Sequence, residues 1–229
     1  VLRLHHKLFR KFSSRYDLIW RAGQESEAWD AEGYNYRQLW RHHSLFIQET
    51  GSIYIAISKS ANSAIRRSLT GTSFYRAFDR GLNRQHQIFQ LPDIDKTLSE
   101  VIEAAIPVFT VVRDPVSRFW SAYQDKIVQN PGSRIAEEVA AFYKQAPLAA
   151  ISPEMLLDYV EQTPIYKIEE HVRPQWACCG YGRIPFRFIA RVENLPADIE
   201  QAVELGLFPS AAAASIPHSN RSKPVVEDQ

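Results

Sequence analysis

Three apolar runs, each followed by a helical pattern of apolar positions, define the core that the sequence predicts. Residues 53–57 and 107–112 are continuous runs rich in β-branched residues, as in strands buried on both faces, and residues 186–192 form a third candidate strand. The helical patterns that follow these runs cover residues 64–69, 116–127 and 196–205. Because strands alternate with helices, we expect an α/β fold, a P-loop-like three-layer domain in which helices flank a central, mostly parallel sheet.

Further patterns describe the rest of the chain. Two more helices fit at 133–145 and 153–161, the second with Ser152 as its N-cap. Residues 1–50 are rich in aromatic and charged residues without clean periodicity, which predicts a helical, aromatic-rich segment packed on the body formed by 51–229. We expect a single domain overall, ending in an extended loop from residue 215.

The composition supports a folded domain and restricts its partners. Of the 229 residues, 45% are hydrophobic and 23% are charged, which excludes a wholly disordered chain. The net charge is only +1, from 27 Lys and Arg against 26 Asp and Glu, which argues against a protein that coats nucleic acid through bulk charge. We therefore expect no nucleic-acid partner, and an anionic ligand would need a local binding site.

The cysteines and the hydropathy bear on the compartment. Cys178 and Cys179 are neighbours, so they cannot connect distant segments, and they lack the paired spacing of a zinc site. No apolar run reaches the ~18 residues of a transmembrane helix, and charges interrupt residues 1–8 where a secretory signal would be apolar. We expect a cytoplasmic protein without a transmembrane segment. The alternative is a targeting or anchor segment that processing or truncation has removed, since the first residue is not Met.

The turn after residues 53–57 carries the first candidate site. In an open α/β sheet, ligands bind beyond the carboxyl ends of the strands, where helix N-termini offer unpaired N–H groups and partial positive charge. Lys59 and the hydroxyls of Ser60 and Ser63 can surround an oxyanion there. The ATPase pattern GxxxxGK[ST] is absent. By itself, the turn fits an oxyanion-binding loop and a surface loop with a solvated lysine equally well.

The turn after residues 107–112 is more specific. Arg113 follows the strand, Asp114 is placed as a helix N-cap, and Pro115 occupies the first helical position. Ser121 lies two turns along the helix, so an arginine fork and a serine hydroxyl can hold one phosphate group. We assign Asp114 and Pro115 to starting the helix, and the aromatic residues that follow to packing.

The two turns resemble those of sulfotransferases that use 3′-phosphoadenosine 5′-phosphosulfate (PAPS), specifically the carbohydrate sulfotransferases (sulfotransferase family 2). Residues 53–69 resemble the loop that binds the 5′-phosphosulfate, and residues 109–126, with the pattern Arg-Asp-Pro-x-x-Arg-x-x-Ser-x-Tyr, resemble the segment that binds the 3′-phosphate. Residues 170–175 and 188–195 are similar to the family's Glu-His-Trp-x-Pro-Gln region and the strand after it. The resemblance implies that 51–229 form a sulfotransferase-like nucleotide-binding domain.

The resemblance also implies roles for individual residues. Lys59 would hold the 5′-phosphosulfate and act on the leaving oxygen, while Arg113 and Ser121 would bind the 3′-phosphate. Arg221, in a late segment that closes over the nucleotide in relatives, would be a further contact. Asn62 stands where many relatives have glycine, which we attribute to the tolerance of asparagine for the left-handed conformation. The remaining loop contacts would come from Ser60, Asn62, Ser63 and Ala64.

The histidines supply the candidate base. Sulfuryl transfer needs an aligned donor and acceptor, a base for the hydroxyl proton and positive charge for the leaving phosphate, but no metal. The resemblance places the base at His86, which can titrate near neutrality; the residue alone fits a structural histidine equally well, and His171 is the competitor. The expected reaction is in-line transfer from PAPS to a hydroxyl of a carbohydrate or another acceptor, with PAP as product.

Some alternatives stay open at this point. Arg76, Arg80 and Arg84 recur every four residues ahead of His86, which predicts either a basic stripe that attracts an anionic acceptor or a solvated helix face. A nucleotide-dependent kinase on a related fold is a second interpretation of the domain, and a non-catalytic nucleotide- or glycan-binding module is a third. The sequence does not indicate an oligomeric state.

Overall fold

The structure, a computed structural model, describes residues 44–70, 88–90, 104–144, 147–165, 167–182 and 184–216. These residues divide into two compact units. The sheet unit contains the described parts of 40–112 and 186–229, and the helical unit contains those of 113–185. No helix in the described ranges is both long and apolar enough to cross a membrane.

The sheet unit is built on a mixed sheet. Its strands, among the described residues, are β1 (Ser44–Ile47), β2 (Ser52–Ile55), β3 (Ile88–Gln90), β4 (Val108–Val112) and β5 (Phe186–Arg191). They lie in the order β3-β1-β2-β4-β5, and β2, β4 and β5 are parallel neighbours. Since β1 is antiparallel to both β2 and β3, every strand except β1 runs in one direction. The expected α/β fold is confirmed, and the three strands expected from the apolar runs are β2, β4 and β5.

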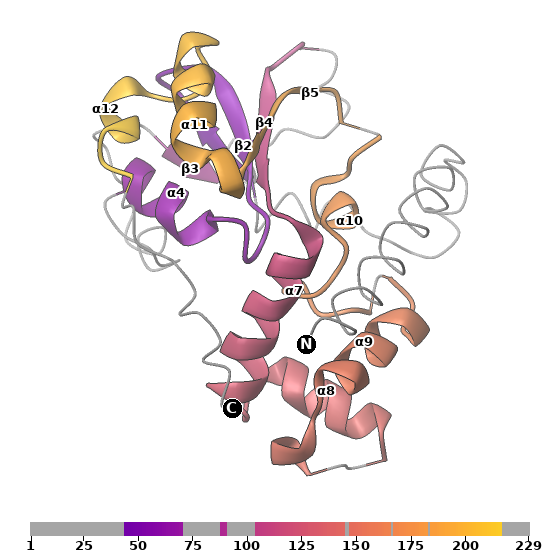
Figure 1. Ribbon diagram of the computed structural model, residues 1–229. Coiled ribbons are helices and arrows are strands. Elements are labelled where there is room, and N and C mark those ends of the chain that lie inside the picture. Colours follow the sequence, from indigo (N-terminus) through magenta and orange to yellow (C-terminus); the bar gives the residue numbers. More distant parts are fainter. Residues whose placement is uncertain are drawn as a thin grey trace. The chain divides into compact units, whose positions relative to one another are not determined.

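Both faces of the central strands are buried. Leu45 of β1 lies opposite Tyr54 of β2, which lies opposite Phe109 of β4, so these side chains share one face of the sheet and pack in one core. The helices whose residues join that core are α4 (Asn62–Thr70), α11 (Leu195–Glu204) and α12 (Ser210–Ala213), with the short η4 (Val192–Asn194) leading into α11. Figure 1 shows α4, α11 and α12 on the same side of the strands. On the other face Ile53 and Thr110 are fully buried as well, which explains the continuous apolar runs.

The helical unit has a core of its own. Its elements are α7 (Pro115–Tyr123), the π-helix η2 (Gln124–Val128) that continues it, α8 (Arg134–Phe142), η3 (Leu148–Ala150), α9 (Pro153–Gln162) and α10 (Gln175–Cys179). Phe119 of α7, Val139 of α8 and Leu156 of α9 are buried together. Figure 1 shows α8 and α9 beside each other, as this shared core requires.

The starts of three helices follow the chemistry that the sequence predicts. Asp114 caps α7 by accepting a hydrogen bond from the N–H of Ser117 (2.8 Å), with Pro115 at the first helical position. Ser133 and Ser152 each accept from the N–H three residues on and so cap α8 and α9. The helices expected at these positions are therefore confirmed, with ends that differ by a few residues.

Several sequence-based expectations lie outside the described residues. They concern the N-terminal segment up to residue 43, the arginines at 76, 80 and 84, His86, Arg221 and the end of the chain from residue 217. These expectations stay predictions.

Candidate functional site

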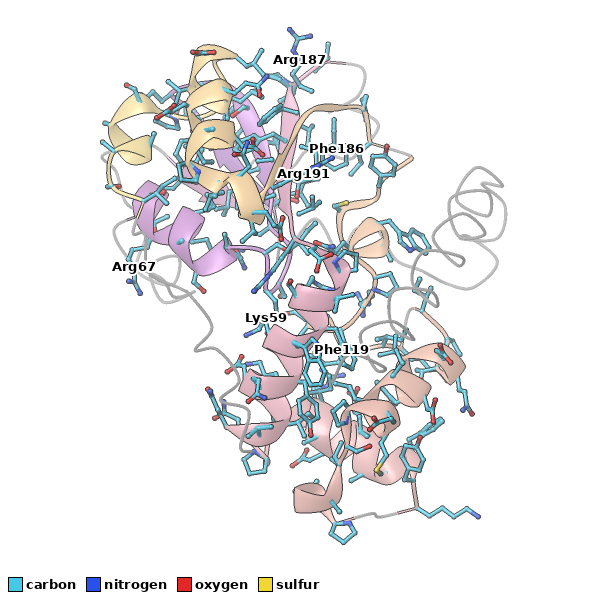
Figure 2. The ribbon with its side chains drawn as sticks, viewed as in Figure 1. Lys59, Arg67, Phe119, Phe186, Arg187 and Arg191 are labelled. Atoms are coloured by element: carbon cyan, nitrogen blue, oxygen red, sulfur yellow. The ribbon has the colours of Figure 1, made fainter. Side chains whose placement is uncertain are left out.

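The first predicted site, the turn between β2 and α4, has an unusual backbone; Figure 2 labels Lys59 on it. Lys59 and Ala61 have φ angles of 67° and 57°, which lie in the left-handed region. Between them Ser60 is buried, and its N–H donates to the carbonyl of Ile57 (3.2 Å). Left-handed residues in a turn before a helix can bring successive backbone N–H groups to one side, as in anion-binding nests. The backbone of this turn is therefore suited to an oxyanion.

The conformation expected at Asn62 is found at its neighbours instead. Asn62 is the first residue of α4, and the left-handed residues are Lys59 and Ala61. The attribution to left-handed tolerance is wrong because the turn is complete before residue 62, where helical backbone angles begin. The side-chain oxygen of Asn62 accepts a hydrogen bond from Nε of Arg66, one helical turn along (2.8 Å). The side chain of Asn62 therefore binds the guanidinium of a residue in its own helix.

The other residues of this loop differ in their access to solvent. Lys59 and Asn62 are half-buried and Ser63 is exposed, whereas Ser60 and Ala64 are buried. Lys59, Asn62 and Ser63 thus have side chains that reach the surface of the loop, whereas Ser60 and Ala64 are covered.

Arg66 is a cation at this site that the sequence analysis missed. Its side chain is only 3% exposed, although it stands on a helix that follows a charged turn. The buried hydroxyl of Tyr54 has no hydrogen-bond partner in the described part of the chain. Burial raises the pKa of Tyr54, and the positive charge of Arg66 opposes that rise. The available signal was the i, i+4 spacing from Asn62, which places the two side chains on one helix face.

A glycine at position 61 tests the strain in this turn. A left-handed residue other than glycine costs about 1–2 kcal/mol, and glycine itself costs about 0.5–1 kcal/mol in chain entropy. We therefore expect Ala61→Gly to raise the free energy of unfolding by about 0.5–1 kcal/mol in urea titrations. The control is Ala141→Gly on the exposed side of α8, which should lower it by up to about 1 kcal/mol. Equal losses for both variants would contradict the strained turn.

The second predicted site, the turn after β4, is held by a side-chain amide. The N–H of Arg113 donates to Oε1 of Gln175 (2.9 Å), and the carbonyl of Arg113 accepts from Nε2 of the same side chain (2.7 Å). Gln175 is 6% exposed and begins α10. Both backbone hydrogen-bonding groups of Arg113 are thus fixed by one buried residue.

The two arginines of the Arg-Asp-Pro-x-x-Arg pattern have different environments. Arg118 is 5% exposed, and its guanidinium donates to the carbonyls of Arg173 (2.8 Å) and Glu170 (3.0 Å). Arg113 and Ser121 are half-buried, and Ser121 lies on α7. Arg118 therefore holds residues 170–173, whereas Arg113 and Ser121 keep part of their surface exposed.

Comparison of the sequence with models of known protein families gives a match that includes both turns. The model of the sulfotransferase family matches residues 42–224, which is most of the chain. The chain belongs to the sulfotransferase family. No curated protein and no solved structure matches it. As a sulfotransferase it transfers a sulfonate group from a donor co-substrate to an acceptor, and its α/β fold agrees with that of a sulfotransferase domain.

The sulfotransferase has a histidine and a carboxylate in contact at His171 and Glu169. Glu169 accepts from the N–H of His171 (2.7 Å) and from its Nδ1 (2.7 Å). Because a carboxylate only accepts, Nδ1 carries the proton and Nε2 is the nitrogen that can take one from another group. Glu170 adds a second carboxylate, and single ligand atoms of the three residues lie within 4.8 Å of one another. Both oxygens of Glu169 thus accept hydrogen bonds from His171, which orients the imidazole ring.

The sulfotransferase keeps its two thiols in the protein interior. Cys178 and Cys179 are free and buried on α10, and burial raises the pKa of both, that of Cys179 to about 12. The Sγ of Cys178 lies near the carbonyls of Glu170 and Arg173 (3.8 and 3.7 Å), the two groups that Arg118 also binds. The thiols are therefore protonated packing groups.

The aromatic residues of α7 belong to the core of the helical unit. Phe119, labelled in Figure 2, is 4% exposed. Trp120 and Tyr123 pack against the same core, and the hydroxyl of Tyr123 donates to the carbonyl of Ile151 (3.0 Å). Their assignment to packing is confirmed.

Proposed function

We propose that this sulfotransferase moves the sulfuryl group of PAPS to a hydroxyl of a carbohydrate acceptor. The observation that carries the proposal is a pair of cationic strand-to-helix turns, Lys59 after β2 and Arg113 after β4, within the span that matches the family. PAPS has two phosphate-type groups, one at each side of its ribose. Two separate cationic turns suit a donor of that kind better than a ligand with a single anionic group.

The residues present fit the two ends of this donor. The N–H groups of Ala64 and Ile65 donate to the carbonyl of Ala61 (2.9 and 3.0 Å), so the N–H groups of Asn62 and Ser63 are the ones that the start of α4 offers to an anion. The left-handed turn before them carries the ammonium of Lys59. This combination suits the 5′-phosphosulfate. Arg113 offers forked donors and Ser121 a neutral one, which suits a phosphate dianion at the 3′ position.

The chemistry requires a proton acceptor and a stabilised leaving group. His86 takes the proton of the acceptor hydroxyl as its oxygen forms a bond to sulfur. The bond between sulfur and the 5′-phosphate oxygen breaks in line with that attack, and PAP leaves. Lys59 neutralises the charge that develops on the leaving phosphate oxygen, where positive charge lowers the barrier most. His171, with Nδ1 bound to Glu169, is the alternative base.

Removal of the Arg113 side chain tests the assignment of the 3′-phosphate. We expect Arg113→Ala to weaken binding of 3′,5′-ADP by about ten- to hundredfold, the worth of one charged hydrogen-bond site of about 1.5–3 kcal/mol. Isothermal titration calorimetry measures this directly. Arg67→Ala changes an exposed residue in the last turn of α4, labelled in Figure 2; it is the control for loss of one positive charge and should leave the affinity unchanged. Unchanged affinity in Arg113→Ala would contradict the assignment.

Transfer of labelled sulfate from PAPS tests the function as a whole. Single-turnover reactions with a pool of glycans, and separately with small alcohols and phenols, should label the glycans. A product labelled only among the phenols would retain the donor and replace the acceptor. Phosphoryl transfer that needs ATP and magnesium would indicate a kinase, and binding of PAP without transfer would indicate a non-catalytic module.

Rising salt should raise the KM of an anionic glycan if the arginines at 76, 80 and 84 attract it.

A further inference from the structure

Arg113 occupies a position that neither the sheet nor the following helix fixes. The ladder between β4 and β5 ends with the pair Val112 and Arg191, and α7 begins only at Pro115. Arg113 therefore lies between two regular elements. The amide of Gln175 supplies the hydrogen bonds that a neighbouring strand would otherwise supply, one to the N–H and one to the carbonyl of Arg113.

The segment that carries Gln175 is itself fastened to the start of α7. Arg118 donates to the carbonyls of Glu170 and Arg173, and Nε of Arg173 donates to the carbonyl of Ile168 (2.9 Å). These contacts are partly buried, with Arg118 itself only 5% exposed, and Gln175 follows them directly at the start of α10. The side chain of Gln175 is therefore presented to Arg113 by a braced segment, so it can impose a position on the residue it binds.

We propose that Gln175 is a positioning residue for Arg113, and that it directs the guanidinium toward the 3′-phosphate of the donor. This inference rests on the proposed function, because it takes Arg113 as the ligand of that phosphate. A guanidinium binds a phosphate through two donors only when its plane is correctly oriented, and a long side chain inherits its direction from the backbone. Gln175 thereby contributes to the preference for nucleotides with a 3′-phosphate without contacting the nucleotide.

The test compares two nucleotides that differ in the 3′-phosphate alone. Calorimetry on Gln175→Leu in the full chain should show binding of 3′,5′-ADP weakened by roughly three- to tenfold, a part of the effect of removing Arg113 itself. Binding of 5′-AMP should stay as in the wild type. A merely structural role would lower both affinities together, which would overturn the proposal.

A double-mutant cycle separates this inference from the proposed function. In the Arg113→Ala background, Gln175→Leu should cause no further loss of 3′,5′-ADP affinity, because the group that it positions is absent. Losses that multiply fully would overturn the positioning role while leaving Arg113 as the phosphate ligand. No effect of Arg113→Ala by itself would overturn the proposed function and this inference with it. Cys179→Ala, a buried change in the same short helix, is the matched control and should leave the ratio of the two affinities unchanged.

Gln175→Glu gives a second, reversible test that does not depend on the leucine variant folding. At about pH 8 a carboxylate would repel the carbonyl of Arg113, whereas at about pH 5.5 the protonated acid can donate to that carbonyl and accept from the N–H, since burial favours the neutral form. The ratio of 3′,5′-ADP to 5′-AMP affinity should therefore fall relative to wild type at the higher pH and recover at the lower. A ratio equal to that of the wild type at both pH values would overturn the proposal.

Discussion

Replacing His86 by alanine is expected to lower kcat by a factor of about 10² to 10⁴, the usual contribution of general acid–base catalysis. The affinity for 3′,5′-ADP should stay unchanged, because the base acts on the acceptor hydroxyl and not on the nucleotide. Single-turnover rates with labelled PAPS measure the first quantity, and calorimetry measures the second.

The matched control is the same replacement at His171. His171 has a carboxylate partner in Glu169, and its Nε2 is able to accept a proton, so it is a chemically competent rival. If His86 is the base, His171→Ala should keep kcat within a small factor of wild type. Full activity in His86→Ala together with a large loss in His171→Ala would identify His171 as the base. The dependence of the rate on pH gives a second test, because only the variant that lacks the base should lose the acidic limb of a bell-shaped profile.

Arg118→Ala is expected to cause the largest loss of stability among the changes considered. It removes a buried guanidinium, leaves the carbonyls of Glu170 and Arg173 without that donor, and opens a cavity. A buried charged hydrogen-bond donor and the space it fills together are worth about 3 kcal/mol. Urea denaturation followed by circular dichroism should show the free energy of unfolding lowered by that amount.

Arg134→Ala provides the comparison on the surface. The side chain of Arg134 is 83% exposed and pairs with Glu138 one helical turn along α8 (2.8 Å). An exposed i, i+4 pair is worth about 0.3–0.5 kcal/mol, so the loss should be several-fold smaller than for Arg118. Similar losses in the two variants would show that Arg118 does not brace the segment after residue 169.

The fold was predictable where a strand is buried on both faces. The runs at 53–57 and 107–112 correspond to β2 and β4, because residues such as Phe109 must be apolar whichever face they occupy. Residues 186–192 correspond to β5, which was recognised although only Ala190 of this strand is fully buried. β1 and β3 were not predicted. They are three or four residues long, and β3 pairs with β1 across some forty residues, so neither has a local pattern long enough to recognise.

The candidate site was predictable as far as local chemistry decides it. The cap at Asp114 depends on a hydrogen bond to the residue three positions on, which a sequence pattern captures. The clamp between Gln175 and Arg113 joins residues 62 positions apart, and the bonds of Arg118 span 55 and 52 positions. No periodicity connects such residues. The left-handed angles of Lys59 and Ala61 were missed for a different reason, since neither residue type prefers that region.

The two adjoining thiols of α10 have a practical consequence. Cys178 and Cys179 are the only cysteines of the chain, and both are shielded and protonated in the folded protein. A thiol-modifying reagent can therefore react only when this segment opens, so the rate of labelling reports how often it does so. The wild-type chain thus contains its own probe of local opening beside Gln175. The probe would reveal whether an occupied nucleotide site slows that opening, without any introduced label.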